Sequence, residues 1–293
     1  TAVGRDCLGL NTSGTQNTAI GTFALDANTT ASDNSAFGFE ALTANTTGTN
    51  NTGIGGKALA ANTTGGGNTA LGRQALMSMQ TGSNNVAVGN SALHTSTDGA
   101  NNTSVGIFSL YYNTSGSLNA ALGRDALGSN TTGGGNVGIG YAAGQNITTG
   151  DNNVCLGNGA SASSATVDNQ ITLGNSSTAT LRCNTQTISS LSDARDKTNV
   201  IDLPEGLDFV TKLRPVKFEW ATRDGNSKDG SYEHGFIAQD LQAAQKENDA
   251  DYLDMVMDEN PDRLEASYGK LVPILVQAVK ELSAKVAALE AVH

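Results

Sequence analysis

The pentapeptide Asn17-Thr18-Ala19-Ile20-Gly21 decides the fold of the first part of the chain, because its pattern returns every 17 residues. An apolar residue precedes each glycine of the series, and the residue before that one is always small. A period held this strictly predicts a repeat architecture rather than a disordered Gly/Asn/Thr-rich segment. The eleven glycines in register are Gly4, Gly21, Gly38, Gly55, Gly72, Gly89, Gly106, Gly123, Gly140, Gly157 and Gly174.

Seventeen residues are too few for a helical hairpin or a propeller blade, but they suffice for one coil of a β-solenoid. We expect two short strands and two turns in each coil. The Asn-Thr-Thr runs at 28–30, 45–47, 62–64 and 130–132 all sit at one phase of the repeat and read as turns. Since stacked coils advance about 4.8 Å each, residues 1–175 predict a shaft roughly 50 Å long.

The alternation of side chains along a strand suggests which residues face inward. We expect the apolar residue before each glycine, such as Ile20, to fill the coil interior. The small residue beside it, such as Ala19, would then face outward. An outward face held to Ala, Gly, Ser, Cys or Thr indicates close packing against another chain. Each coil also has too few large apolar groups for one chain to bury a sufficient core alone.

Composition narrows the function classes. The net charge of −11 argues against nucleic acids and anionic membranes as partners, and no apolar run is long enough to span a bilayer. The chain has neither an initiator Met nor a signal-peptide pattern, so we expect it to be a piece of a longer one. Cys7, Cys155 and Cys183 are far apart, so we expect no disulfide framework, no metal and no cofactor.

The composition changes at Ser192. Residues 1–191 carry 8 acidic and 5 basic side chains, whereas 192–293 carry 20 and 12, and 30 of the 35 glycines lie before this point. We therefore predict a repeat over 1–175 and a tapering neck over 176–191. A mixed domain over 192–293 completes the division. In the neck, residues 179–182 and 187–188 read as strands.

The segment 192–293 predicts an α+β domain. A short helix is expected from about Pro204 to Leu213, strands at 216–220 and 232–237, a helix at 239–246, and a hairpin formed by 253–257 and 264–268. The last segment is a long helix whose apolar residues alternate spacings of three and four. They are a and d positions of a coiled coil, namely Val272, Leu275, Val279, Leu282, Val286 and Leu289. Val at a with Leu at d more often favours two strands.

The repeat resembles the head repeats of trimeric autotransporter adhesins, with their Asn-Ser/Thr-x-Ile-Gly core. It is still more similar to the 17-residue repeats of phage tail fibres. Both families form trimeric left-handed parallel β-rolls. The resemblance therefore implies a homotrimer, and a threefold body of this kind would hold three C-terminal helices together despite their dimer-like heptads.

The segment 192–293 resembles the C-terminal intramolecular chaperone of phage tail spikes and fibres, of the endosialidase type. A related domain occurs in myelin regulatory factors. Four motifs occur in order: Ser192-Asp193-x-Arg195-x-Lys197-x-Asn199, Leu213-Arg214-Pro215-Val216-x-Phe218, His234-Gly235-Phe236-Ile237-Ala238-Gln239 and Tyr268-x-x-Leu271-Val272-Pro273.

This resemblance implies a trimeric chaperone that assembles the upstream β-structure and then cuts itself off. Carried across, Ser192 is the nucleophile, Lys197 is the base, and the scissile bond is Leu191–Ser192. Asp193, Arg195 and Asn199 are candidates for supporting roles. The implied protein is a tail-fibre segment of a virion, assembled in the host cytoplasm, extracellular when mature and able to bind a host receptor.

The chemistry is consistent with the residues themselves. A serine hydroxyl is a poor nucleophile until a base takes its proton. A lysine can be that base only when neutral, which requires burial or nearby positive charge. Arg195 is a source of such charge, and we expect Asp193 and Asp196 to point away or to pair with arginines. Ser192 would attack the carbonyl of Leu191 and give an ester that water opens.

Other functions are open. A bacterial trimeric surface adhesin with the same chaperone is the main alternative, and it predicts a membrane anchor. A membrane-tethered transcription factor released by cleavage would need a basic DNA-binding domain. An enzyme acting on an external substrate is disfavoured because the repeat has few charged residues and a single histidine, His94.

Overall fold

The computed structural model describes residues 1–178, 182, 192–221, 230–258, 260–262 and 264–292. The chain divides into two compact units, Thr1–Asn175 and Ser176–His293, which are described separately. Most of the predicted neck, including both of its strands almost entirely, lies outside the described residues, so that prediction is not tested here.

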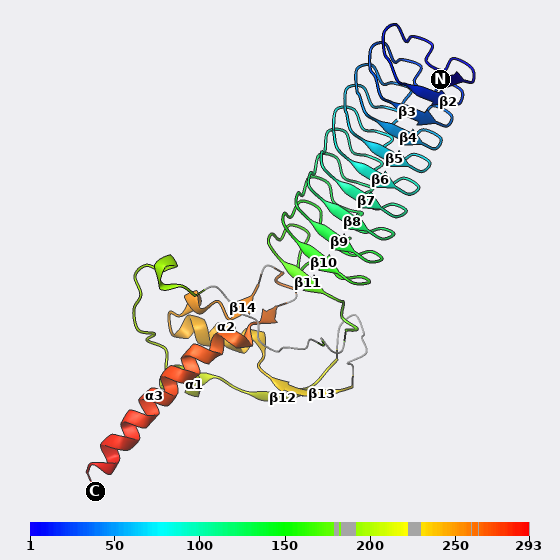
Figure 1. Ribbon diagram of the computed structural model, residues 1–293. Coiled ribbons are helices and arrows are strands. Elements are labelled where there is room, and N and C mark those ends of the chain that lie inside the picture. Colours follow the sequence, from blue (N-terminus) through cyan, green and yellow to red (C-terminus); the bar gives the residue numbers. More distant parts are fainter. Residues whose placement is uncertain (179–181, 183–191, 222–229, 259, 263, 293) are drawn as a thin grey trace. The chain divides into compact units, whose positions relative to one another are not determined.

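The first unit is a β-solenoid, as the repeat predicts (Figure 1). Its strands form one parallel sheet in sequence order, and each strand pairs with the strand 17 residues away, as Ala19 does with Ala36. The strands are β1 (Ala2–Val3), β2 (Thr18–Ile20), β3 (Ser35–Phe37), β4 (Thr52–Ile54), β5 (Thr69–Leu71), β6 (Val86–Val88), β7 (Thr103–Val105), β8 (Ala120–Leu122), β9 (Val137–Ile139), β10 (Val154–Leu156) and β11 (Ile171–Leu173).

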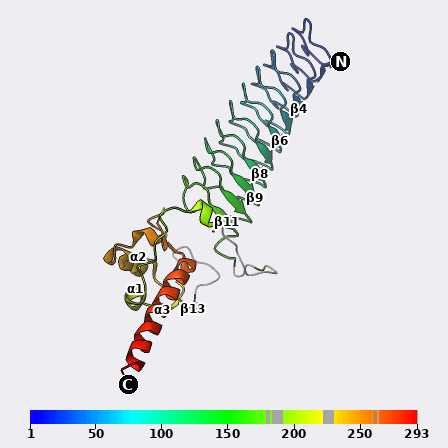
Figure 2. The same cartoon turned by 60° about the vertical axis from the view of Figure 1, so that its left-hand side comes forward.

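Each coil has one strand, so the prediction of two strands per coil is wrong. The remainder of the coil is a series of tight turns and bends, visible as the loops opposite the strands in Figure 2. In the second coil Phe23 and Leu25 have φ of 60° and 51°, and the same two positions are left-handed in most other coils. Alternating left-handed residues curl the backbone, so this side of the coil cannot extend into a second strand.

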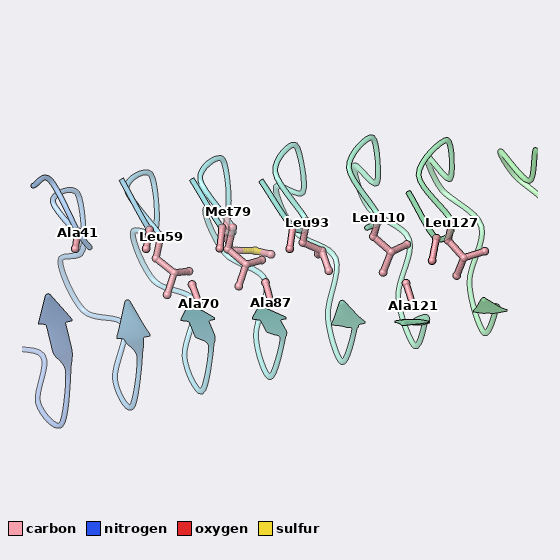
Figure 3. Close-up of a cluster of buried hydrophobic side chains, with 14 of the residues drawn as sticks. Ala41, Leu59, Ala70, Met79, Ala87, Leu93, Leu110, Ala121 and Leu127 are labelled. Carbon is pink, nitrogen blue, oxygen red and sulfur yellow. The ribbon is translucent and has the colours of Figure 1, made fainter. Parts of the chain in front are cut away.

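The assignment of the two strand faces is also reversed. The small residues Ala36, Ala70 and Ala87 are fully buried, whereas the apolar residues before the glycines face outward, with Leu71 46% exposed. Figure 3 shows the reason, because the labelled leucines of the loops reach across the coil toward the strand alanines. Those leucines already occupy the interior, so only a small side chain fits opposite them.

Two glycines on the strands show how little space remains inside the coil. A Cβ added at Gly138 would lie 2.9 Å from Cγ of Leu127, and one added at Gly53 would lie 3.4 Å from Cγ of Leu42. In the coil where the repeat has Gly144 in place of the leucine, Ile147 is fully buried instead. The interior volume of each coil is therefore kept nearly constant even where individual residues change.

Overpacking this interior is expected to destabilise the shaft. Ala87→Leu inserts three carbons into a filled coil and should cost about 1–3 kcal/mol or more. Thr46→Leu, on the partly exposed turn of another coil, is the matched control and should have a smaller effect. Denaturant unfolding followed by circular dichroism measures the difference. Equal stability of the two variants would contradict the assignment of the alanine column to the interior.

Two columns of buried asparagines link neighbouring coils through the hydrogen bonds of their side chains. In the first column, which runs from Asn17 to Asn153, these bonds are made to the backbone. Each side chain accepts from the backbone N–H 17 residues on, which belongs to an asparagine in every case except Gln170. It also donates to a carbonyl 14 residues on. For Asn51 these bonds measure 3.0 Å, from the N–H of Asn68, and 2.8 Å, to the carbonyl of Gly65. These bonds satisfy polar groups that would otherwise be buried without hydrogen-bond partners.

The second column, the asparagine ladder, joins amide to amide. Asn28, Asn45 and Asn62 each donate from Nδ2 to Oδ1 of the asparagine in the preceding coil, at 2.8, 3.1 and 2.8 Å. The ladder stops where the next coil has Met79, and Oδ1 of Asn62 is buried without a partner among the described residues. Met79, which replaces the next asparagine, therefore leaves one buried oxygen of the described residues without a hydrogen bond, and this lowers the stability of the shaft.

The ladder predicts a difference between two otherwise similar substitutions. Asn45→Ala removes two donated bonds and one accepted bond, leaving Oδ1 of Asn28 buried and unpaired. Asn62→Ala removes only two bonds; it leaves Oδ1 of Asn45 unpaired but eliminates the already unpaired Oδ1 of Asn62, so the number of unpaired buried oxygens does not rise. We expect Asn45→Ala to be the more destabilising by about 1–3 kcal/mol, the cost of one unsatisfied buried group. Equilibrium unfolding of both variants tests this, and an equal loss would be inconsistent with it.

The second unit is the predicted α+β region. Its elements are η1 (Ala194–Asp196), α1 (Leu207–Lys212), β12 (Val216–Glu219), β13 (Tyr232–Gly235), α2 (Ala238–Glu247), η2 (Asp251–Leu253), β14 (Val256–Met257), β15 (Glu265–Ala266), η3 (Tyr268–Lys270) and α3 (Leu271–Glu290). Both predicted strand pairs form, β12 with β13 and β14 with β15, each antiparallel. The core gathers Phe209 of α1, Leu241 of α2, Val256 of β14, and Leu271 and Ile274 of α3.

Candidate functional site

Ser192 and Lys197 are brought together by one tight turn. Oδ1 of Asp193 accepts the backbone N–H of Arg195 at 2.9 Å and caps η1. The turn reverses the chain, so that Nζ of Lys197 donates to Oγ of Ser192 at 2.6 Å. The short motif therefore places a hydroxyl and an amine in direct contact through local structure alone.

Asp193 and Arg195 form an ion pair beside this contact. Oδ2 of Asp193 lies 2.6 Å from Nη2 of Arg195, as expected for an aspartate that pairs with an arginine. The Arg195 side chain, and then its backbone N–H, hold the pKa of Asp193 below its ordinary value, while Asp193 raises the pKa of Arg195. Because the pair is nearly neutral as a unit, Arg195 adds little net positive potential at Lys197.

The Ser192–Lys197 contact is open to solvent in the single chain. Ser192 and Lys197 are both exposed, and the ammonium donates to the hydroxyl. A general base must instead be a neutral amine that accepts the hydroxyl proton, and a lysine reaches that state when it is desolvated. The geometry of the dyad is thus present in one chain, whereas the desolvation that would activate Lys197 is not.

Two further predicted site residues are Leu191 and Asn199. Leu191, on the acyl side of the predicted scissile bond, lies outside the described residues. Asn199 is exposed with φ of 53°, and nothing in the described structure ties its side chain to Ser192 or Lys197. Its left-handed backbone turns the chain just after the motif, a conformation that asparagine tolerates better than most residues.

Two of the other motifs meet at Tyr268. Its hydroxyl accepts the backbone N–H of Phe236 at 3.1 Å and donates to the carbonyl of the same residue at 3.3 Å. The rings of Phe236 and Tyr268 pack edge to face with centroids 5.8 Å apart. A Cβ added at Gly235 would lie 2.5 Å from the Tyr268 hydroxyl, which explains why the motif has glycine there. The sequence alone did not pair these residues.

This close approach predicts coupled substitutions. Gly235→Ala should destabilise the domain more in the wild-type background than in Tyr268→Phe, because removing the hydroxyl relieves the closest contact. Tyr268→Phe alone should cost about 0.5–1.5 kcal/mol for each hydrogen bond lost. A double-mutant cycle on denaturant unfolding measures the coupling. Strictly additive effects would show that the two residues do not touch in solution.

Glu281 of α3 caps α1 across 74 residues of sequence. Its Oε2 accepts the N–H of Leu207 at 2.8 Å, and its Oε1 accepts from Gln277 at 2.9 Å. The pKa of Glu281 is lowered, first by the bond from Leu207 and then by that from Gln277. The long helix is thereby fixed to the domain at its N-terminal half, where Ile274 and Ala278 are also buried.

The predicted a and d positions of α3 are all exposed in the single chain. They lie on a face different from that of Leu271, Ile274 and Ala278, which pack into the core. The strand face of the solenoid shows a comparable row of exposed apolar side chains, which includes Ile20, Phe37, Ile54, Leu71 and Leu122. Both units therefore present a long apolar surface that the chain itself does not cover.

The described residues offer little to other classes of site. They contain no group of three or more His, Cys, Asp or Glu side chains placed to bind a metal ion. Nor do they contain a helix with the length and hydropathy required to cross a membrane.

With this geometry established, comparison with known proteins gives one match. Residues 192–249 match the family described as chaperone of endosialidase. No curated protein and no solved structure matches the chain. The match begins at the dyad serine and ends just after α2, so it includes three of the four motifs, and the fourth reaches the same core through Tyr268.

These observations define a class. The chain is a β-solenoid of 17-residue coils followed by a region that matches the chaperone-of-endosialidase family, with a C-terminal helix. This combination fits a tail-fibre-like or tail-spike-like protein with a chaperone.

Proposed function

We propose that the chain is a segment of a phage tail fibre whose C-terminal domain assembles three copies and then releases itself by cutting Leu191–Ser192. The observation that carries the cleavage is the 2.6 Å contact between Lys197 Nζ and Ser192 Oγ at the start of the chaperone domain. Ser192 is the nucleophile and Lys197 the base. The reaction is a single turnover, so no external substrate is required.

Assembly is supported by the two uncovered apolar surfaces. A free monomer would keep two apolar surfaces in water. One is the row of apolar side chains that precede the glycines, such as Ile20 and Leu71, which we call the strand-face stripe; the other is formed by the a and d residues of α3. Three copies would bury both surfaces. The sequence pattern assigns the interface between chains to the small residues such as Ala19, whereas the structure favours the strand-face stripe. The corrected strand faces therefore move the proposed interface to the large apolar residues without changing the number of copies.

The two steps are linked through Lys197. Its ammonium is exposed in one chain, and a lysine must lose water to act as a base at neutral pH. Packing of copies around the dyad would supply that desolvation, so cleavage waits for assembly. Once the chaperone has left, the shaft cannot readily reassemble after unfolding, which makes the folded state kinetically persistent.

Light scattering and intact mass on the purified full chain test the proposal together. We expect a particle of three times the chain mass before cleavage and of three times the mass of residues 1–191 after the chaperone leaves, with two fragments separated at Leu191–Ser192. A folded monomer at micromolar concentration would end the trimer proposal. A trimer in which every chain stays uncut after prolonged incubation would end the cleavage proposal alone.

A further inference from the structure

Four aromatic rings gather on the loop side of two neighbouring coils. The ring of Tyr111 stacks on that of His94, with centroids 5.0 Å apart and planes 15° apart. Phe108 and Tyr112 meet Tyr111 edge to face, with centroids at 5.5 and 4.8 Å. We call these four residues the aromatic platform. It joins residues from adjacent coils into one contiguous surface.

The platform is open to solvent. Tyr112 is 57% exposed and Phe108 is 39% exposed, so these rings are not part of the coil interior. At the positions of Tyr111 and Tyr112 the next coil has Gly128 and Ser129, which offer no side chain large enough to cover the rings. Phe23 and Phe39 form another ring contact on earlier coils, but among the described residues the platform is the larger cluster, and an exposed cluster of four rings indicates a binding surface.

The buried structure changes at the same place. The loop that contains His94 has Ser96 at the position where the ladder asparagines stand in other coils. Oγ1 of Thr95 instead donates to the carbonyls of Tyr111 and Asn113, at 2.8 and 3.2 Å, and ties the two loops of the platform together. The same position also lacks asparagine at Met79 and Ile147, so what distinguishes the platform is the pair of bonds from Thr95 that joins its two loops.

The surroundings favour an uncharged ligand. Arg124 and Asp125 of the next coil pair with each other at 3.1 Å, and burial lowers the pKa of His94, which keeps its ring neutral at pH 7. The hydroxyls of the neighbouring Thr95 and Thr97 donate to the carbonyls of Tyr111 and Thr114, so toward a ligand they act as hydrogen-bond acceptors. Flat apolar rings bordered by hydroxyls match the apolar face and the hydroxyl edge of a sugar ring.

The small extent of the platform separates it from the strand-face stripe. The stripe runs through all the coils and suits another chain, whereas the platform occupies two coils and suits a small ligand. We propose that the aromatic platform binds one neutral pyranose unit of a glycan, with Tyr112 and Phe108 as the stacking rings. This inference rests on the proposed tail-fibre function, to which it adds a receptor-binding site and a ligand class.

The test uses saturation-transfer NMR and calorimetry on the full chain with three neutral probes, maltohexaose, cellohexaose and chitohexaose, and with polygalacturonate as an acidic comparison. We expect at least one neutral hexasaccharide to receive saturation at its ring protons. Its affinity should fall at least tenfold in Tyr112→Ala and in Phe108→Ala. Leu118→Ala, which removes a 67% exposed apolar side chain from another part of the same coil, should bind like wild type.

Light scattering and the cleavage gel on the same variants separate this inference from the proposed function. Lost binding with wild-type assembly and cleavage supports the platform. Binding of none of the neutral probes, preference for polygalacturonate, or equal losses in Leu118→Ala and Tyr112→Ala would overturn it. A wild-type chain that binds the glycan as a monomer, or uncut, would leave the platform standing while removing the corresponding part of the proposed function.

Discussion

Lys197→Ala is expected to yield an assembled fibre segment that stays joined to its chaperone. The substitution removes the amine that contacts Ser192 Oγ at 2.6 Å but touches no residue of the domain core. Loss of a general base slows a reaction by roughly 10²–10⁴-fold, so little cut product should form during expression. Ser192→Ala removes the nucleophile itself and should abolish cleavage. Both variants should still form trimers.

A denaturing gel and light scattering measure the two outcomes in parallel. Lys246→Ala is the matched control, because Lys246 is an exposed lysine of the same domain in the last turn of α2, and it should be cut normally. Efficient cleavage of Lys197→Ala would exclude the Ser192–Lys197 mechanism. Failure of both dyad variants to assemble would show that the motif is structural.

Leu282→Asp is expected to abolish assembly and cleavage together. Leu282 is a d position of α3, exposed in the single chain and buried in the proposed trimer. The substitution would place three unpaired carboxylates in one coiled-coil layer, each of which costs several kcal/mol when buried. The dyad of an unassembled chain stays in water, so Lys197 is not desolvated and Ser192 is not activated.

Ala284→Asp controls for charge on the same helix. Ala284 is exposed and lies outside the a and d positions, so its carboxylate would face solvent in a trimer. This variant should assemble and cleave as the wild type does. If light scattering shows that the Leu282→Asp chain is monomeric and the gel shows that it is cut, cleavage does not require assembly.

The sequence was sufficient for the solenoid, its period and the α+β region, because glycines in strict register leave few other architectures. It was insufficient for the side-chain faces, since period-two alternation says that Ala19 and Ile20 face opposite ways but not which one faces inward. The leucines four residues after the glycines decide that, by filling the interior from the loop side. Their left-handed backbone also removes the predicted second strand.

The candidate site was foreseeable in part. A serine and a lysine five residues apart are consistent with contact, but only the turn capped by Asp193 places Nζ on Oγ. The contact of Tyr268 with Phe236, and the cap that Glu281 provides for α1, join residues 32 and 74 apart in sequence. No local pattern reports such pairs, although Gly235 was a signal that another group comes close.

The asparagine columns give the shaft a unit of growth. Each column bond spans one coil, so a side chain finds its partner only when the next coil begins 17 residues later. An in-frame gain or loss of 17 codons adds or removes one coil and changes the length by about 4.8 Å, with every bond across the junction re-formed. An insertion of any other length within a coil shifts both the strand residues and the asparagines out of register with the neighbouring coils. The length of the shaft can therefore change only in whole coils of 17 residues.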